Sequence, residues 1–161
     1  MEKQCLKLIS ADKQVKISAT QGTETLASAD DIFSSIDPNF KNWGCDEAEQ
    51  PTEETDVEVY EQIEDADYRT IFGSLDQNLD RLCLTTPQIK SFVMNNAKDY
   101  MLEVEGWTYF RSLFKAGDEF FIADVRVNAD DKRDVRIRHF SYDGICHAEH
   151  RHRIVVPQLV S

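Results

Sequence analysis

Two short polar turns divide much of the C-terminal third into β-rich segments, and this spacing limits the possible folds more than any other feature. Residues 109–115, 119–128 and 134–140 are extended runs joined by compact turns that contain Gly, Asp or both. In the second and third runs, valine or isoleucine alternates with charged residues, which is typical of half-buried strands. Connections this short join antiparallel neighbours. We therefore expect an antiparallel β-meander, with residues 149–156 as its fourth strand.

The preceding two-thirds of the chain carries mainly helical signals. Thr86 and Pro87 suit the N-cap and the first position of a helix that reaches about residue 100. A capping-box pattern at Ser74 and Gln77 and a stripe of leucines predict a helix over about 75–83. Shorter helices are expected at 29–36 and 67–72, where Ser28 is the N-cap of the first and Gly73 ends the second.

Two further segments are read from weaker patterns. Residues 5–9 and 15–17 are short β-like runs, and the polar residues 11–13 between them predict a hairpin. Residues 56–64 fit a strand through Val57 and Val59, and a helix through the spacing of Val57, Tyr60 and Ile63. We favour a helix because Asp56 is a suitable cap.

These elements predict one α+β domain over residues 1–161, in which a helical N-terminal two-thirds packs on a C-terminal antiparallel meander. Its parts are hairpin-like (1–20), mainly helical and acidic (28–105), and β-meander (107–157). The longest apolar run is only four residues, 120–123, so we expect no membrane span and no signal peptide. The four cysteines form no C-x-x-C pair, and we expect free thiols in a cytoplasmic protein.

Acidic residues concentrate in the middle of the chain. Residues 24–80 contain 17 acidic side chains against Lys41 and Arg69, a net of −15, and the whole chain carries −12. Such a charge argues against direct binding to nucleic-acid phosphates. The pattern favours a solvated face, and the functional alternatives are docking of a basic protein partner or mimicry of a nucleic acid.

Histidines and a cysteine gather near the C-terminus. Cys146, His150 and His152 lie within seven residues, and His139 lies on the preceding strand. These side chains are transition-metal ligands, so a zinc site formed by His139, His150, His152 and Cys146 is possible. The spacing matches neither H-E-x-x-H nor a zinc-finger pattern. We therefore predict no cofactor and interpret the segment as an exposed polar strand.

Arginines of the last two expected strands suggest a second site. Arg136, Arg138, Arg151 and Arg153 cluster if these strands pair, and arginine suits bidentate binding of phosphate or carboxylate. The alternative is that they form ordinary surface ion pairs with acidic side chains. A basic pole opposite an acidic one also makes head-to-tail self-association possible.

Motifs of nucleophilic or nucleotide chemistry, such as G-x-S-x-G, G-x-x-x-x-G-K-[ST] and G-x-G-x-x-G, do not occur. A dyad of Cys146 with His147, or of Cys83 with a histidine that the fold brings near it, stays open. The leading hypothesis is a non-enzymatic protein-interaction module. The alternative is a small metal-dependent hydrolase that uses residues 147–152.

Four segments together resemble a known group of proteins. They are residues 40–44 (FKNWG), 71–75 (IFGSL), 79–85 (LDRLCLT) and 151–159 (RHRIVVPQL). They are similar to a family of small proteins of unknown function from uncultivated bacteria with reduced genomes. The resemblance spans residues 22–159 and implies a free-standing bacterial protein. It assigns no activity, cofactor or functional residue.

Overall fold

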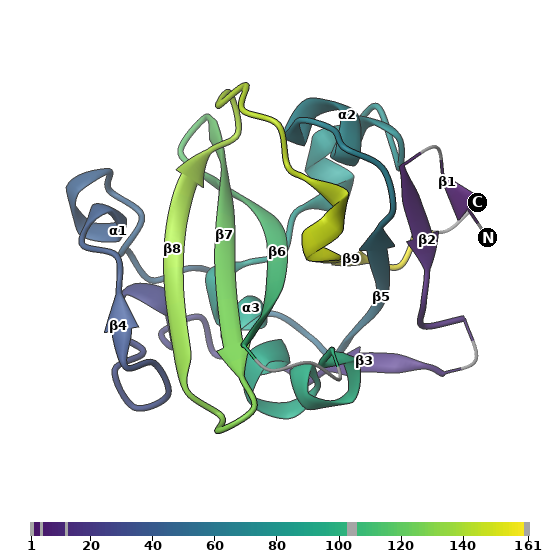
Figure 1. The fold of residues 1–161 in the computed structure, drawn as a ribbon. Coiled ribbons are helices and arrows are strands. Elements are labelled where there is room, and N and C mark those ends of the chain that lie inside the picture. Colours follow the sequence, from purple (N-terminus) through teal and green to yellow (C-terminus); the bar gives the residue numbers. More distant parts are fainter. Residues whose placement is uncertain (1, 4, 12, 103–105, 160–161) are drawn as a thin grey trace.

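The computed structural model describes residues 2–3, 5–11, 13–102 and 106–159, and the strands in these ranges form one mixed sheet. The strands are β1 (Glu2–Lys3), β2 (Leu6–Leu8), β3 (Val15–Ile17), β4 (Ser35–Ile36), β5 (Thr55–Gln62), β6 (Trp107–Ala116), β7 (Glu119–Asn128), β8 (Arg133–His139) and β9 (Arg153–Pro157). Their order is β1-β2-β5-β9-β6-β7-β8-β4, and β3 pairs with β5. In Figure 1, β6, β7 and β8 lie side by side, and β1 lies at the far edge of the sheet.

Short helices cover both faces of the sheet. They are α1 (Asn39–Asn42), α2 (Tyr68–Gly73) and α3 (Thr86–Asn95), with single 3₁₀ turns η1 (Leu26–Ser28), η2 (Leu79–Leu82), η3 (Ala97–Tyr100) and η4 (Ala148–His150). On one face, Phe92 of α3 meets Phe110 of β6 at 5.9 Å between ring centroids. On the other face, Ile71 and Phe72 of α2 share a core with Leu113 and Ile122. In the described ranges, every helix is too short or too polar to cross a bilayer.

The expectation of a helical N-terminal two-thirds on a C-terminal meander is wrong. Residues 55–62 form strand β5, not a helix, and β5 pairs with β2, β3 and β9. Val57 and Val59 belong to the core on one face of the sheet and Tyr60 to the core on the other, which the alternation of side chains along a strand allows. The expected hairpin of residues 5–9 and 15–17 is also wrong, since both runs pair with β5. Asp12 of its turn lies outside the described residues.

Two expected helices are replaced by shorter elements. Ser74 is the C-cap of α2 instead of an N-cap, and only the 3₁₀ turn η2 follows it. Residues 29–36 begin with Ala29, the C-cap of η1, and end in strand β4. Their apolar side chains pack without a continuous helix, because tertiary contacts override such short local patterns.

Two of the expected helices are present. The helix expected at 67–72 is confirmed as α2, and Asp67 Oδ1 accepts a hydrogen bond from Thr70 N at 2.9 Å. The helix expected from Thr86 is confirmed as α3. It is capped one residue earlier, by a reciprocal box of Thr85 and Gln88, and ends at Asn95.

The prediction of a meander is correct for its first three strands and wrong for the fourth. β6–β7 and β7–β8 are antiparallel, as their short turns require. β9 begins only at Arg153 and lies between β5 and β6, antiparallel to the first and parallel to the second. A long connection, residues 140–152, lets the chain return across the sheet and reach this place. That connection contains η4, and Arg151 adopts a left-handed conformation with φ of 49°.

The outer edge of β8 is closed by residues before α1. β4 pairs with β8 over two residues, and Asp37 Oδ2 then accepts a hydrogen bond from Ile137 N at 3.2 Å.

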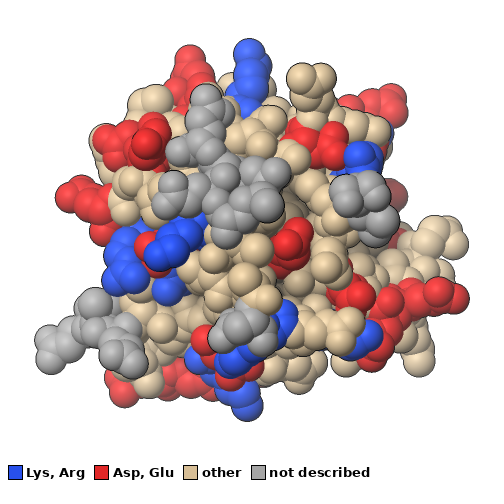
Figure 2. All heavy atoms as spheres, turned by 90° about the vertical axis from the view of Figure 1, so that its right-hand side faces the viewer, with Lys and Arg blue, Asp and Glu red and all other residues tan. Residues whose placement is uncertain are grey.

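Charged side chains are mixed over the face that carries β1. Acidic side chains there are spread around the margin, with basic ones among them (Figure 2).

Candidate functional site

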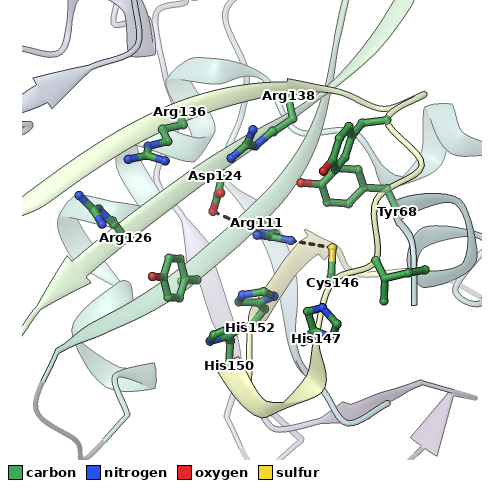
Figure 3. Close-up of a pocket in the computed structure, with 13 residues that line it drawn as sticks. Tyr68, Arg111, Asp124, Arg126, Arg136, Arg138, Cys146, His147, His150 and His152 are labelled. Atoms are coloured by element: carbon green, nitrogen blue, oxygen red, sulfur yellow. Dashed lines mark hydrogen bonds and ion pairs between the residues drawn. The ribbon is translucent and has the colours of Figure 1, made fainter. Parts of the chain in front are cut away.

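A cavity of about 320 Å³ opens on the face of β6, β7 and β8 that α2 also covers. The strand register places Arg111, Asp124 and Arg136 in one row across this face. Tyr109, Arg126, Arg138 and Tyr68 extend the floor and one side. The connection between β8 and β9 supplies the opposite wall, where Figure 3 shows Cys146, His147, His150 and His152 across the pocket from Arg136. Six side chains of this connection line the cavity. They are Tyr142, Ile145, Cys146, His147, His150 and His152.

Arg111 is the buried cation at the centre of the floor. Its side chain is 11% exposed, and its Nε lies 3.4 Å from Oδ1 of Asp124, which is 8% exposed. Nη1 donates a hydrogen bond to Sγ of Cys146 at 2.8 Å. Burial lowers the pKa of Arg111, but Asp124, Tyr68 and Cys146 more than offset this, so the net pKa is raised. Arg111 is therefore a permanent charge that is already partnered.

Arg126 is also engaged, although its side chain lines the cavity. Nη2 donates to Oδ2 of Asp134 at 2.7 Å, and the guanidinium carbon lies 4.2 Å from the centroid of the Trp107 ring. Contacts on a carboxylate and an aromatic ring hold this guanidinium in one orientation.

Arg136 and Arg138 differ from these two arginines. Both are exposed and lie on the cavity side of β8. Among the residues that the structure describes, neither has a hydrogen bond or an ion pair to a carboxylate, and Figure 3 shows both guanidinium groups extended over the pocket. Two cations with unused donors thus flank a cavity whose floor carries two more. In a chain of net charge −12, this is a localised basic surface that the overall charge conceals.

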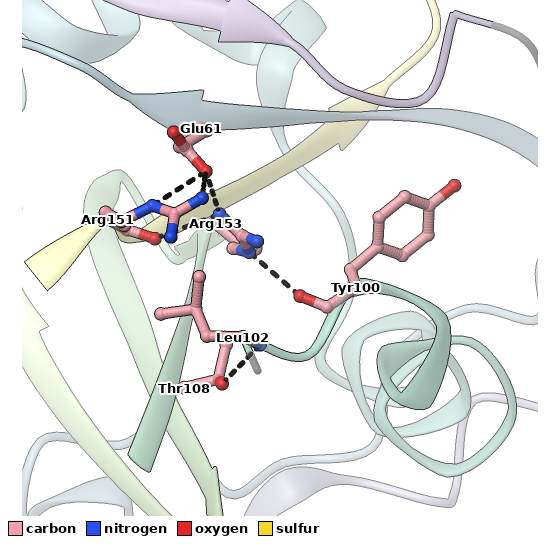
Figure 4. Close-up of polar contacts among 6 residues, drawn as sticks. All are labelled: Glu61, Tyr100, Leu102, Thr108, Arg151 and Arg153. Atoms are coloured by element: carbon pink, nitrogen blue, oxygen red, sulfur yellow. Dashed lines mark hydrogen bonds and ion pairs between the residues drawn. The ribbon is translucent and has the colours of Figure 1, made fainter. Parts of the chain in front are cut away.

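The other two arginines predicted for the anion site lie elsewhere. Arg153 is buried on the opposite face of the sheet, where its Nε donates to the Tyr100 carbonyl at 2.8 Å (Figure 4). Its Nη1 and the Nη2 of Arg151 both contact Oε1 of Glu61, at 2.5 and 3.0 Å. These arginines therefore hold β9 to β5 and to the segment after α3.

The residues predicted for a metal site are only partly brought together. Cys146, His150 and His152 all line the cavity, and the rings of the two histidines stack with centroids 5.5 Å apart. His139 points to the other face of the sheet, where its ring lies 4.1 Å from Trp43. In the described part of the chain, no group of three or more His, Cys, Asp or Glu side chains is placed to hold a metal ion.

Three functional candidates were missed in the sequence, namely Tyr109, Arg111 and Arg126. What could have identified them is their position relative to the turn between β6 and β7. The tight turn after β6 fixes the register, so Arg111 must lie opposite Asp124 and Arg126 opposite Tyr109. Charged and polar side chains paired in this way on one face of two long strands indicate a polar floor.

Comparisons with protein-family models, with curated proteins and with solved structures gave no match. The function is therefore inferred from the site.

Proposed function

We propose that this protein is a binding module for a small organic phosphate. The phosphate group of this ligand is held in the pocket between β8 and the 140–152 connection. The observation that carries the proposal is the pair Arg136 and Arg138. Their guanidinium groups have no carboxylate partner in the described residues, yet they lie over a cavity, beside the partnered cations Arg111 and Arg126.

Phosphate fits this arrangement better than carboxylate. A planar carboxylate is satisfied by one bidentate arginine, whereas a phosphate monoester offers three terminal oxygens and a charge of −1.5 to −2 near neutral pH. Two unpaired guanidinium groups side by side on one strand match that charge and number of acceptors. The cavity volume of about 320 Å³ lies at the lower end of small-molecule sites, roughly 300–1,000 Å³.

The test is a calorimetric titration with methyl phosphate, sulfate and acetate at low salt. We expect methyl phosphate to bind most tightly and its dissociation constant to rise roughly tenfold or more in Arg136→Gln/Arg138→Gln. Arg151→Gln is the matched control, because it removes an arginine outside the pocket. An unchanged affinity in the double variant, or equal weakening in the control, would contradict the proposal. So would a wild-type protein that binds none of the three anions.

Docking of a basic protein partner on the acidic segment stays a prediction, as do self-association and nucleic-acid mimicry. Several of the acidic side chains concerned already have internal partners. Glu49 accepts from both the backbone N and the hydroxyl of Thr86, Asp67 caps α2, and Glu61 binds two arginines. On the face in Figure 2 the acidic side chains are dispersed, whereas mimicry needs them gathered on one surface.

A further inference from the structure

Gln62 determines which nitrogen of His152 carries the proton. The Nε2 of Gln62 donates to the Glu64 carbonyl at 2.9 Å and to the Cys146 carbonyl at 2.6 Å. Both amide hydrogens are thereby used, and a flipped amide would place oxygen against two carbonyl oxygens. The Oε1 of Gln62 is therefore an acceptor, and His152 Nδ1, 3.2 Å away, must be the donor. In a neutral ring this leaves a lone pair on Nε2.

The ring of His152 stays neutral. The residue is 3% exposed, and burial, followed by the charge of Arg111 and the neighbouring His150, lowers its pKa to about 3. Although it belongs to a cluster of histidines and arginines, His152 thus adds no positive charge to the pocket near neutral pH. It contributes an acceptor in a site where most polar groups are donors.

That acceptor belongs to a ring that is fixed in place and borders the cavity. The ring of Tyr109 meets His152 edge-on at 5.2 Å, and His150 stacks on it at 5.5 Å. His152 lines the pocket, and no described residue is a hydrogen-bond partner of its Nε2. An acceptor with restricted access to water gains most from a ligand group that donates to it.

We infer that the pocket takes a phosphate monoester whose organic part carries a hydroxyl group, with the phosphate on Arg136 and Arg138 and the hydroxyl donating to Nε2 of His152. This rests on the proposed phosphate site and narrows its ligand class to polyol or sugar phosphates. An alkyl phosphate of the same size would leave the Nε2 acceptor unpaired, which is the basis of the selectivity.

The first experiment compares glycerol 3-phosphate with propyl phosphate, which share a three-carbon skeleton and differ in hydroxyl groups. By calorimetry we expect glycerol 3-phosphate to bind wild-type protein roughly fivefold more tightly or better, as one hydrogen bond would give. In His152→Phe the two dissociation constants should become equal, while that of propyl phosphate changes little. The variant His139→Phe is the matched control, because His139 lies on the other face of the sheet, and it should keep the preference.

The outcomes separate the two proposals. Equal binding of both compounds to wild-type protein would overturn the hydroxyl inference and leave the phosphate site standing. Binding of neither compound would overturn the phosphate site itself.

A second measurement does not depend on whether His152→Phe folds. A ¹⁵N spectrum of labelled wild-type histidines should show the His152 ring protonated at Nδ1. The Nε2 resonance should move when glycerol 3-phosphate binds and stay in place when propyl phosphate binds. A ring protonated at Nε2, or an Nε2 resonance that ignores bound glycerol 3-phosphate, would contradict the inference.

Discussion

The guanidinium of Arg111 joins the floor of the sheet to the connection that covers it, because its Nη1 donates a hydrogen bond to Sγ of Cys146 at 2.8 Å. The backbone of Cys146 is also paired, with Ala66 N and O at 3.1 and 2.8 Å. The connection of residues 140–152 is thus fixed at its midpoint from two sides. The pocket wall it forms is a defined surface and not a loose loop.

Burial should make the thiols of the folded protein slow to react. It raises the pKa of all four, to about 11 for Cys45 and about 12 for Cys83, and at Cys146 it outweighs the opposing effect of Arg111. The thiolate is the reactive form. We expect an aromatic disulfide reagent at pH 7.5 to label native protein far more slowly than the urea-unfolded chain, followed by absorbance. The opposite result would be one thiol that reacts as fast in the native protein as in the unfolded chain. If that reaction disappears in Cys146→Ala, Cys146 is an activated thiol.

Removing the carboxylate of Glu61 should destabilise the fold strongly. Its partner Arg153 has a side chain only 8% exposed, and Glu61→Gln leaves that buried cation without an opposite charge. We expect the free energy of unfolding to fall by about 3 kcal/mol, measured by urea denaturation. Arg151→Gln removes the exposed partner of the same carboxylate and should cost less than about 1 kcal/mol. Equal losses in both variants would mean that the Arg153 pair has no special weight.

Stability should depend on the titration of His152. Its pKa is about 3 in the folded state against 6.5 for the free side chain, so between these values the unfolded chain binds a proton that the folded chain excludes. The contribution of the neutral His152 ring to the free energy of unfolding is complete above pH 6.5. It is lost as the pH falls toward 3, by up to about 1.4 kcal/mol per pH unit. Urea denaturation between pH 5 and 7 measures this slope. His152→Phe should flatten it, and parallel slopes in wild type and His152→Phe would refute the assignment.

Asp37 should protect the outer edge of β8. Its Oδ2 accepts from Ile137 N and its Oδ1 from Asn39 N at 2.9 Å. Asp37→Ala removes both acceptors, and we expect it to lower the free energy of unfolding by about 1–2 kcal/mol and to increase light scattering at high protein concentration. Asp37→Asn keeps one acceptor oxygen, so its free energy of unfolding should lie between those of wild type and Asp37→Ala. Unchanged stability and scattering in Asp37→Ala would contradict this role.

The parts of the fold that the sequence predicted depend on contacts between near neighbours. Asp67 and Thr85 cap α2 and α3 within three residues, and two compact turns determine the β6–β7–β8 pairing. β5 and β9 were misjudged because their pairing joins residues about 90 positions apart, such as Glu61 and Arg153. Local patterns carry no information on such a pairing.

The candidate site was likewise predictable only where its residues belong to one strand. Alternation on β8 correctly placed Arg136 and Arg138 on one face, because both belong to one strand. Arg151 and Arg153 were grouped with them on the assumption that β9 neighbours β8. In the structure β9 pairs with β6, and its register sets Arg153 beside Phe110 on the opposite face. The pocket also depends on the return of the 140–152 connection, which no periodicity predicts.

The position of β9 has a consequence for the order in which the protein folds. β9 is the last strand of the sheet in the sequence, yet it lies between β5 and β6. During synthesis, every other strand leaves the ribosome before the one that joins these two. Until then β5 and β6 each expose a row of unpaired backbone groups to other chains. We therefore expect the nascent chain to be prone to aggregation until residues 153–157 emerge.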